Sequence, residues 1–351
     1  MALTRRGQIL TVLIVAVVII GAVVGLVAFG STKKTPSANG TPGGGPSGSP
    51  TLPPPPPICP LTGVRSASSV PNRPALAVKV ENLPSARPQT GLSWADIVYE
   101  EPVEANITRF IAVYQCRDAS RIEPIRSGRL TDPDILVQFG HPVFGYAGAV
   151  REVMVRVAQR GIIDVNFNRA AGAYHRDPNR PQPHNLYSST QALYAAAHTH
   201  QAAPQPMFTY AVRLAAGARK ISVIHVPFSS YSDVFWKWSG SKKAWLRFHG
   251  DVPHLLSDGT QVSARNVIVQ IVRITLSDVT DVNGVHSPYV VSVGTGKAYI
   301  FRNGKMIAGK WIRRSLHDVT RFVDAQGNVI PLWPGNTWIE LVPTNIKARF
   351  S

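Results

Sequence analysis

Carboxylates and arginines that are able to share one reaction or one ligand are concentrated between residues 96 and 129. Glu100 and Glu104 precede Arg109 closely enough for an acid/base pair beside a guanidinium, which suits phosphoryl or glycosyl chemistry. Arg126 and Arg129 flank a serine and a glycine, and two guanidiniums so close together suit a phosphate or carboxylate ligand. The alternative is an internal salt-bridge network, and the spacing alone does not decide between the two.

A polar, proline-rich loop from Tyr174 to Tyr187 is the second candidate region. His184 is its candidate general base because an imidazole titrates near neutral pH, although a capping or hydrogen-bonding role is the alternative. Arg176 and Asn185 are candidate ligand-binding residues, since loops of this composition often carry function.

We expect no metal site and no cofactor. His198 and His200 are two residues apart, a spacing that a helix does not direct at one metal ion, and no third ligand accompanies them. Gly294–Lys297 lacks the spacing of a phosphate-binding loop and leads into strand-like residues instead of a helix.

Two neighbouring strands must position the first group of residues. Asp96–Tyr99 is predicted as one strand, Glu100–Glu104 as a turn and Ile107–Cys116 as the second strand. The two-residue period of a strand places Arg109 on one face with three aliphatic side chains, Ile107, Ile111 and Val113. A charge in such surroundings needs a partner, because an unpaired buried charge is costly.

The predicted fold class is α+β, with an N-terminal α/β-type domain over residues 59–215 and a mostly antiparallel β domain over residues 216–351. Helical spacing predicts a helix over Val150–Arg160, and Ser188 and Ser189 are candidate N-cap residues for a second helix over Thr190–His198. Asn303 and Gly304, between two alternating segments, predict a two-residue hairpin. Six tryptophans in the second region are either core residues or a stacking platform for sugars: Trp236, Trp238, Trp245, Trp311, Trp333 and Trp338.

A membrane anchor is predicted at the start of the chain. After a short cytoplasmic tail, residues 1–8, the apolar run Ile9–Phe29 is long enough to span about 30 Å of hydrocarbon at about 1.5 Å per residue. Basic residues on its two sides are nearly balanced. A disordered linker rich in glycine, serine and proline follows over residues 30–58 and favours a tethered domain outside the cytoplasm.

The two cysteines of the chain, Cys59 and Cys116, are either a disulfide or a pair of reduced thiols. An extracytoplasmic location favours the disulfide. Such a bridge would close a loop of about 57 residues and stabilise the fold by roughly 4 kcal/mol.

The folded region is strongly basic. The formal net charge of the chain is +17, and all 20 acidic residues but only 33 of the 37 basic ones lie beyond residue 58, which leaves +13. Outside the cytoplasm such an excess attracts anionic envelope polymers, lipid head groups or lipid-linked sugars, and nucleic acid is not expected as a partner. The alternative is a generally basic, solvated surface.

Long motifs in both halves carry a resemblance to a known family. They include Ala95–Phe110, Pro124–Arg129, Arg176–Tyr187 and Pro331–Pro343. From residue 60 to residue 345 the chain resembles the YerB-like family of bacterial lipoproteins, known as a two-part domain of unknown function. The resemblance implies two domains and an envelope location, and it brings no established activity. The chain departs from the lipoprotein type at its start, where a spanning helix replaces the lipidated cysteine.

The chain also resembles, by analogy, the LytR-CpsA-Psr wall-polymer transferases. This resemblance rests on a strand that begins at Asp96, a turn, a second strand and the arginine motif that follows. The arginines of those transferases hold a polyprenyl pyrophosphate.

Our leading hypothesis is a single-pass, extracytoplasmic membrane protein that binds an anionic envelope polymer or lipid-linked ligand. The rival hypothesis is a hydrolase or transferase on phosphate-linked or glycosidic envelope substrates, with Glu100 or Glu104 as acid or base. The sequence does not set the oligomeric state.

Overall fold

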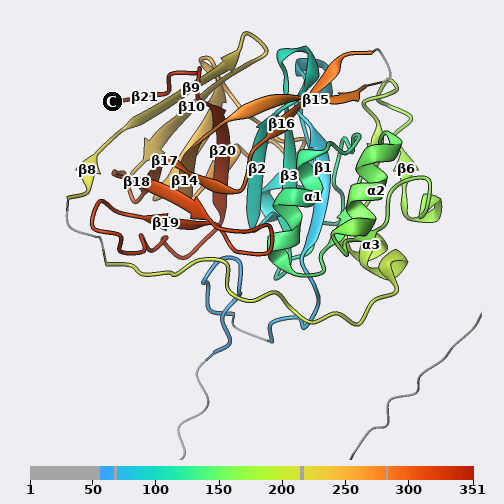
Figure 1. The fold of residues 1–351 in the computed structure, drawn as a ribbon, viewed down its shortest axis with the longest axis horizontal. Helices are drawn as coiled ribbons and strands as arrows, with labels where there is room; N and C mark the ends of the chain where they lie inside the picture. Colours follow the sequence, from blue (N-terminus) through green and yellow to red (C-terminus); the bar gives the residue numbers. More distant parts are fainter. Residues whose placement is uncertain (1–55, 67–68, 214–216, 282–283) are drawn as a thin grey trace, which may run out of the picture. The chain divides into compact units, whose positions relative to one another are not determined.

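One mixed sheet extends through both halves of the sequence (Figure 1). The computed structural model describes residues 56–351 except 67–68, 214–216 and 282–283. Within these residues the sheet has 11 strands. In spatial order they are β19 (Arg321–Val323), β18 (Lys305–Arg313), β17 (Gly294–Arg302), β14 (Asn266–Val272), β20 (Thr337–Pro343), β2 (Ile97–Pro102), β3 (Thr108–Tyr114), β1 (Leu76–Glu81), β4 (Val143–Gly145) and β5 (Ile163–Asp164), while β8 (Arg219–Lys220) pairs with β18.

Strand β20 joins the two halves. It pairs in parallel with β14 on one side and with β2 on the other, so that Thr337 lies opposite both Asn266 and Ile97. Because the halves share this sheet, residues Pro54–Ser351 form one compact unit. The expected boundary between residues 215 and 216 falls at a segment outside the described residues.

A second, six-stranded sheet covers one face of the large sheet. It contains β12 (Val252–Pro253), β11 (Ala244–His249), β10 (Ser232–Ser239), β9 (Val223–Ser229) and β21 (Arg349–Phe350), with β13 (Ser263–Ala264) beside β11. Trp236 and Trp245 from this sheet are buried with Phe110 and Trp338 from the large sheet. The core role of these tryptophans is therefore confirmed.

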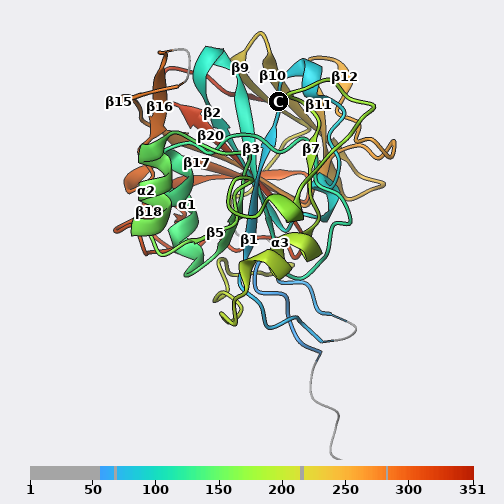
Figure 2. The same cartoon turned by 90° about the vertical axis from the view of Figure 1, so that its right-hand side faces the viewer.

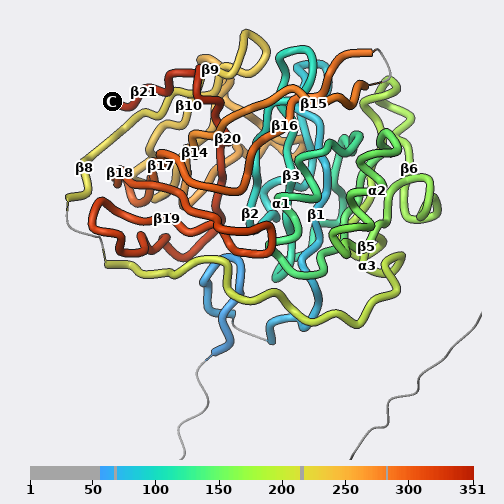
Figure 3. The backbone as a smooth tube through the Cα atoms, viewed as in Figure 1, coloured from blue at the N-terminus to red at the C-terminus, as the bar shows by residue number. Residues whose placement is uncertain are grey.

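Two helices lie on the opposite face. They are α1 (Thr131–Leu136) and α2 (Arg151–Gln159), which lie next to each other in Figure 2. Leu136 and Val157 pack there with aliphatic residues of β1 to β3. The third helix, α3 (Thr190–Ala197), packs through Leu193 on the core cluster that contains Trp236 and Trp338. The chain after α3, up to residue 213, runs along one side of the structure (Figure 3).

The remaining elements are short. Two hairpins stand apart from the sheets, β15 (Ile274–Thr280) with β16 (His286–Val290) and β6 (His175–Arg176) with β7 (Leu186–Tyr187). The 3₁₀ turns are Pro84–Ala86, Leu92–Trp94, Glu104–Asn106, Val137–Phe139 and Ala171–Ala173.

The α+β class and several local predictions are confirmed. Helix α2 covers Arg151–Gln159, and the Ser189 side chain caps α3 by accepting a hydrogen bond from the Ala192 amide. Asn303 and Gly304 adopt positive φ angles of 49° and 68°, as the tight turn between β17 and β18 requires.

The predicted Glu100–Glu104 turn is wrong. Strand β2 continues through Pro102, because Glu100 and Glu101 both find buried partners on opposite faces of the sheet, and the turn begins at Val103.

No helix among the described residues is long and apolar enough to cross a bilayer. The predicted tail, the span Ile9–Phe29 and nearly all of the predicted linker lie outside the described residues.

Candidate functional site

Three neighbouring strands place charged residues in one row across a face of the large sheet. Arg109 of β3 lies opposite Glu81 of β1 and opposite Glu101 of β2. Residues opposite one another in an antiparallel pair share a face. Ile111 and Val113 belong to the core on this face, so the predicted position of Arg109 among aliphatic side chains is confirmed.

Lys79 neutralises the carboxylates at one end of the row. Its ammonium contacts Glu101 and lies 2.7 Å from Asp132, and all three side chains are buried. Burial raises the pKa of Glu101 to about 8, although the charge of Lys79 acts in the opposite direction. This group is closed to solvent and serves the fold.

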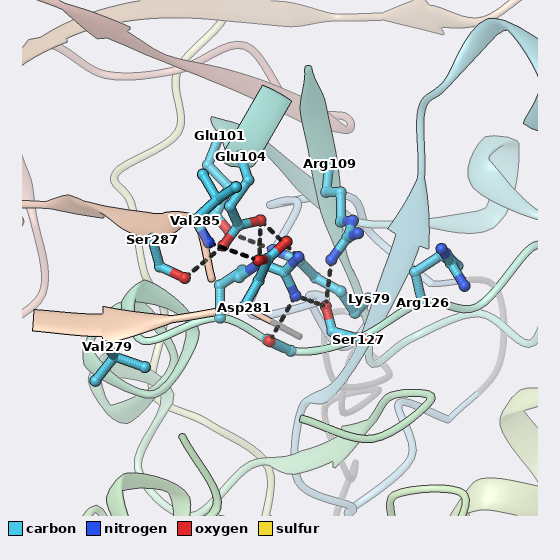
Figure 4. A network of polar contacts seen from close by, with 12 residues as sticks. Lys79, Glu101, Glu104, Arg109, Arg126, Ser127, Val279, Asp281, Val285 and Ser287 are labelled. Carbon is cyan, nitrogen blue, oxygen red and sulfur yellow. Dashed lines mark hydrogen bonds and ion pairs between the residues drawn. The ribbon is translucent and has the colours of Figure 1, made fainter. Parts of the chain in front are cut away.

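Glu104 and Arg129 form the second pair (Figure 4). Two guanidinium nitrogens of Arg129 lie 2.6 and 2.7 Å from Oε2 of Glu104, and the hydroxyl of Ser287 donates to Oε1. Burial raises the pKa of Glu104, but the charge and hydrogen bonds of Arg129 and the hydroxyl outweigh it, so the pKa lies below its ordinary value. Both carboxylate oxygens are engaged, as in the salt-bridge alternative.

Arg109 differs from its neighbours because no carboxylate among the described residues pairs with it. It is 6% exposed, and its Nη1 donates to the carbonyl of Ser127 over 3.0 Å, as Figure 4 shows. Its buried Nε has no hydrogen-bond partner. Burial, reinforced by the charges of Arg129 and Arg126, lowers the pKa of Arg109 to about 9, so the group remains charged at neutral pH.

Arg126 is held by Glu81, a residue that the sequence did not single out. Its Nε lies 3.1 Å from Oε1 of Glu81, and Nδ1 of His184 lies 2.8 Å from Oε2 of the same carboxylate. The structure thus links His184 to the arginine group, although the two segments are far apart in the sequence.

A pocket of about 400 Å³ adjoins the three arginines. Beside them its wall contains the turn Ser127–Gly128, the segment Ala147–Val150 before α2, and Val153, Asp281 and Ser287. No side chain caps the N-terminus of α2, which begins after Val150. We call this space the arginine pocket.

Glu100 lies elsewhere, because adjacent residues of a strand face opposite sides of the sheet. It is fully buried between the two sheets, where it lies 2.6 Å from Arg247 and accepts hydrogen bonds from Thr108 and Asn82. Glu340 of β20 is its neighbour across the strands, and burial together with Glu100 raises the pKa of Glu340 well above its ordinary value.

Arg176 and Asn185 bind each other on the β6–β7 hairpin. Nη1 of Arg176 donates to the Asn185 side chain over 2.9 Å, and its guanidinium lies over the ring of Phe167. Neither residue lines the arginine pocket.

The predicted disulfide is confirmed. Cys59 and Cys116 are bonded, with Cα atoms 5.9 Å apart. The bridge ties the start of the folded region to the segment after β3.

Comparison with known proteins identifies the family. The N-terminal domain of a family described as "Protein of unknown function (DUF3048)" matches residues 61–203, and the C-terminal domain of that family matches residues 224–339. The chain belongs to this YerB-like family. The Bacillus subtilis (strain 168) protein named "Putative lipoprotein YerB" is 27% identical over 315 residues, which cover 83% of this chain and 88% of that protein.

The fold is shared with a solved member of the family. The crystal structure of YerB from Bacillus subtilis superposes with a TM-score of 0.72 at 24% identity, and the match covers 84% of this chain and 99% of that structure. The names of these YerB-like relatives state neither a ligand nor a reaction.

Proposed function

We propose that this YerB-like protein is anchored to the cell membrane, faces outward, and binds an anionic envelope ligand in the arginine pocket. The ligand would present a phosphate or a carboxylate to Arg109, with Arg126 and Arg129 on either side. The observation that carries the proposal is Arg109 itself, a buried guanidinium beside a pocket and without a carboxylate partner among the described residues.

An unpaired buried charge is expensive, with an effective penalty of several kcal/mol. A bound anion that pairs with the charge would offset this penalty. The buried Nε of Arg109 has no hydrogen-bond partner, and the volume of the adjoining pocket, about 400 Å³, lies within the usual range for small ligands.

The surroundings of Arg109 also favour an anion. Three arginines and one aspartate, Asp281, are the charged residues of the lining. Glu81 and Glu104 hold the guanidiniums of Arg126 and Arg129 in place, so little conformational entropy is lost on binding. The uncapped N-terminus of α2 adds a partial positive charge on the same wall.

Membrane attachment is supported by the apolar run Ile9–Phe29 and by the lipoprotein name of the relative. The rival function, an enzyme with Glu100 or Glu104 as acid or base, has less support. Glu100 is enclosed between the sheets, and both oxygens of Glu104 are engaged.

The test is titration calorimetry of residues 56–351 with inorganic pyrophosphate, inorganic phosphate and citrate, for the wild type and Arg109→Met. We expect Arg109→Met to remove binding and to leave thermal stability equal to or above that of the unliganded wild type, since methionine fills the site without a charge. Arg349→Gln, an exposed arginine on β21, is the matched control and should bind normally.

Unchanged binding by Arg109→Met, or no binding of any probe by the wild type, would contradict the proposal. A large loss of stability in Arg109→Met would instead assign Arg109 to the scaffold.

A further inference from the structure

We propose a second site, in which Ser85, His184 and Glu81 act as nucleophile, general base and orienting carboxylate for hydrolysis of a short-chain ester of a polar alcohol. This inference does not depend on anion binding in the arginine pocket. It rests on the mutual geometry of three side chains and on the pocket that Ser85 lines.

The three side chains contact one another in sequence, with His184 between Ser85 and Glu81. Oγ of Ser85 lies 3.3 Å from Nε2 of His184, and Nδ1 of His184 lies 2.8 Å from Oε2 of Glu81. With the proton on Nδ1 donated to Glu81, Nε2 is the acceptor for the serine hydroxyl. This order of nucleophile, base and carboxylate is recognised by geometry and not by position in the sequence.

The fold gives each member the exposure that its role needs. Glu81, the last residue of β1, is fully buried, and the His184 side chain is 16% exposed. Ser85 lies on the 3₁₀ turn Pro84–Ala86 and is exposed. The nucleophile is therefore accessible while the carboxylate that orients the imidazole is shielded from water.

Ser85 lines a pocket of about 500 Å³, separate from the arginine pocket. Eight of its ten lining residues are polar or charged, and only Pro88 and Pro181 are not. Such a lining favours a small acyl group on a polar alcohol, such as a sugar hydroxyl, over a long acyl chain.

Two arginines fix the turn that carries Ser85. Arg180 donates to the carbonyls of Ala86 and Pro88 over 2.7 and 3.0 Å, and Arg87 donates to the carbonyl of Asn82 over 2.8 Å. Both line the pocket, so they add positive charge to its wall, which would favour the oxyanion of an attacked ester.

The reaction follows from these roles. Oγ of Ser85 bonds to the ester carbonyl carbon while its proton passes to Nε2 of His184. The bond to the alcohol oxygen then breaks, and the imidazolium returns that proton to the departing alcohol. Water, deprotonated by the same imidazole, then attacks the acyl carbon. The bond between that carbon and Oγ of Ser85 breaks, the imidazolium returns the proton to Oγ, and a carboxylic acid leaves. Glu81 is a positioning residue throughout.

The test uses a fluorophosphonate probe, with mass spectrometry to locate the label, and p-nitrophenyl acetate turnover. We expect one label on Ser85 and none on Ser85→Ala, with turnover lost to the same extent. Ser315→Ala, an exposed serine that does not line this pocket, is the control and should behave as wild type. His184→Gln should slow labelling by about 10² to 10⁴-fold, the usual contribution of a general base.

Labelling or turnover that depends on Ser85 would support the site. The absence of both in the folded wild type, or equal turnover by Ser85→Ala, would overturn it. Glu81→Gln should leave Ser85 accessible and change the pH profile of labelling, which a purely structural carboxylate would not do.

Discussion

Arg247 fixes the charge state of two histidines, and this makes the stability of the protein depend on pH. Its Nη1 lies 2.8 Å from Nε2 of His249 and 2.7 Å from Nδ1 of His254. A guanidinium nitrogen only donates, so both imidazoles must be neutral acceptors. Burial, followed by the charge of Arg247, lowers the pKa of both histidines well below the ordinary value.

The sign of the effect follows from the unfolded chain. There each histidine takes up a proton below about pH 6.5, while the folded protein excludes it. Stability is therefore fully present above pH 6.5 and is lost as the pH falls. One excluded proton corresponds to about 1.4 kcal/mol for each pH unit below 6.5, so His254 alone costs about 1.4 kcal/mol between pH 7.5 and pH 5.5.

Glu101 acts in the opposite direction. Its pKa is raised to about 8, so its contribution to stability is present at low pH and is lost as the pH rises toward 8. The total pH dependence of the wild type thus mixes opposing effects. A comparison between variants at two pH values isolates the histidine.

The variant is His254→Asn, because the asparagine oxygen preserves an acceptor for Arg247 near the position of Nδ1. Urea unfolding, followed through the buried Trp236 and Trp338, measures the free energy of unfolding at pH 7.5 and pH 5.5. The variant should be less stable at pH 7.5, because a smaller side chain leaves a gap. The difference from wild type should shrink by about 1.4 kcal/mol at pH 5.5.

His317→Asn, which changes an exposed histidine, is the control and should show a difference that is independent of pH. If the gap between wild type and His254→Asn is the same at both pH values, the reasoning about Arg247 is refuted.

Two further predictions concern buried and covalent contacts. Arg247→Met leaves Glu100 in the interior without its guanidinium, and it should lower the free energy of unfolding, measured in urea, by about 3–5 kcal/mol. Adding Glu100→Gln should recover part of this loss. If it recovers nothing, packing and not charge is responsible for the loss. Replacing Cys59 and Cys116 together with serine should lower the free energy of unfolding by about 4 kcal/mol, the loop-entropy value for 57 residues; an unchanged urea midpoint would contradict that account.

Local signals in the sequence predicted the local features well. The hairpin at Asn303, the cap at Ser189 and helix α2 depend on neighbours within a few residues, and all are confirmed. The disulfide followed from cysteine count and location. The face that Arg109 shares with Ile111 followed from the period of a strand.

The sequence failed where both faces of a strand are buried. In β1 the helices cover the face that carries Lys79, and this lysine is buried between Glu101 and Asp132. A lysine or glutamate inside an otherwise aliphatic strand is the signal for such a buried charge. Without knowledge of its partner, the same residue is equally consistent with a position that faces solvent.

Contacts between residues that are far apart in the sequence could not be predicted from local patterns either. Arg247 lies almost 150 residues after Glu100, and Ser287 lies more than 180 residues after Glu104. Only the assembled sheets bring such residues together. For the same reason His184, a candidate general base from the sequence, is joined to Ser85 and Glu81 only in the fold.

The position of β20 determines when the protein can become stable during its synthesis. This strand begins at Thr337, far along the chain from the end of β2 at Pro102, yet it lies between β2 and β14 in the large sheet. Until it emerges, each of those strands has an unpaired edge, and such edges favour aggregation. The large sheet is therefore complete only after β20 has been synthesised, and the two halves become stable together.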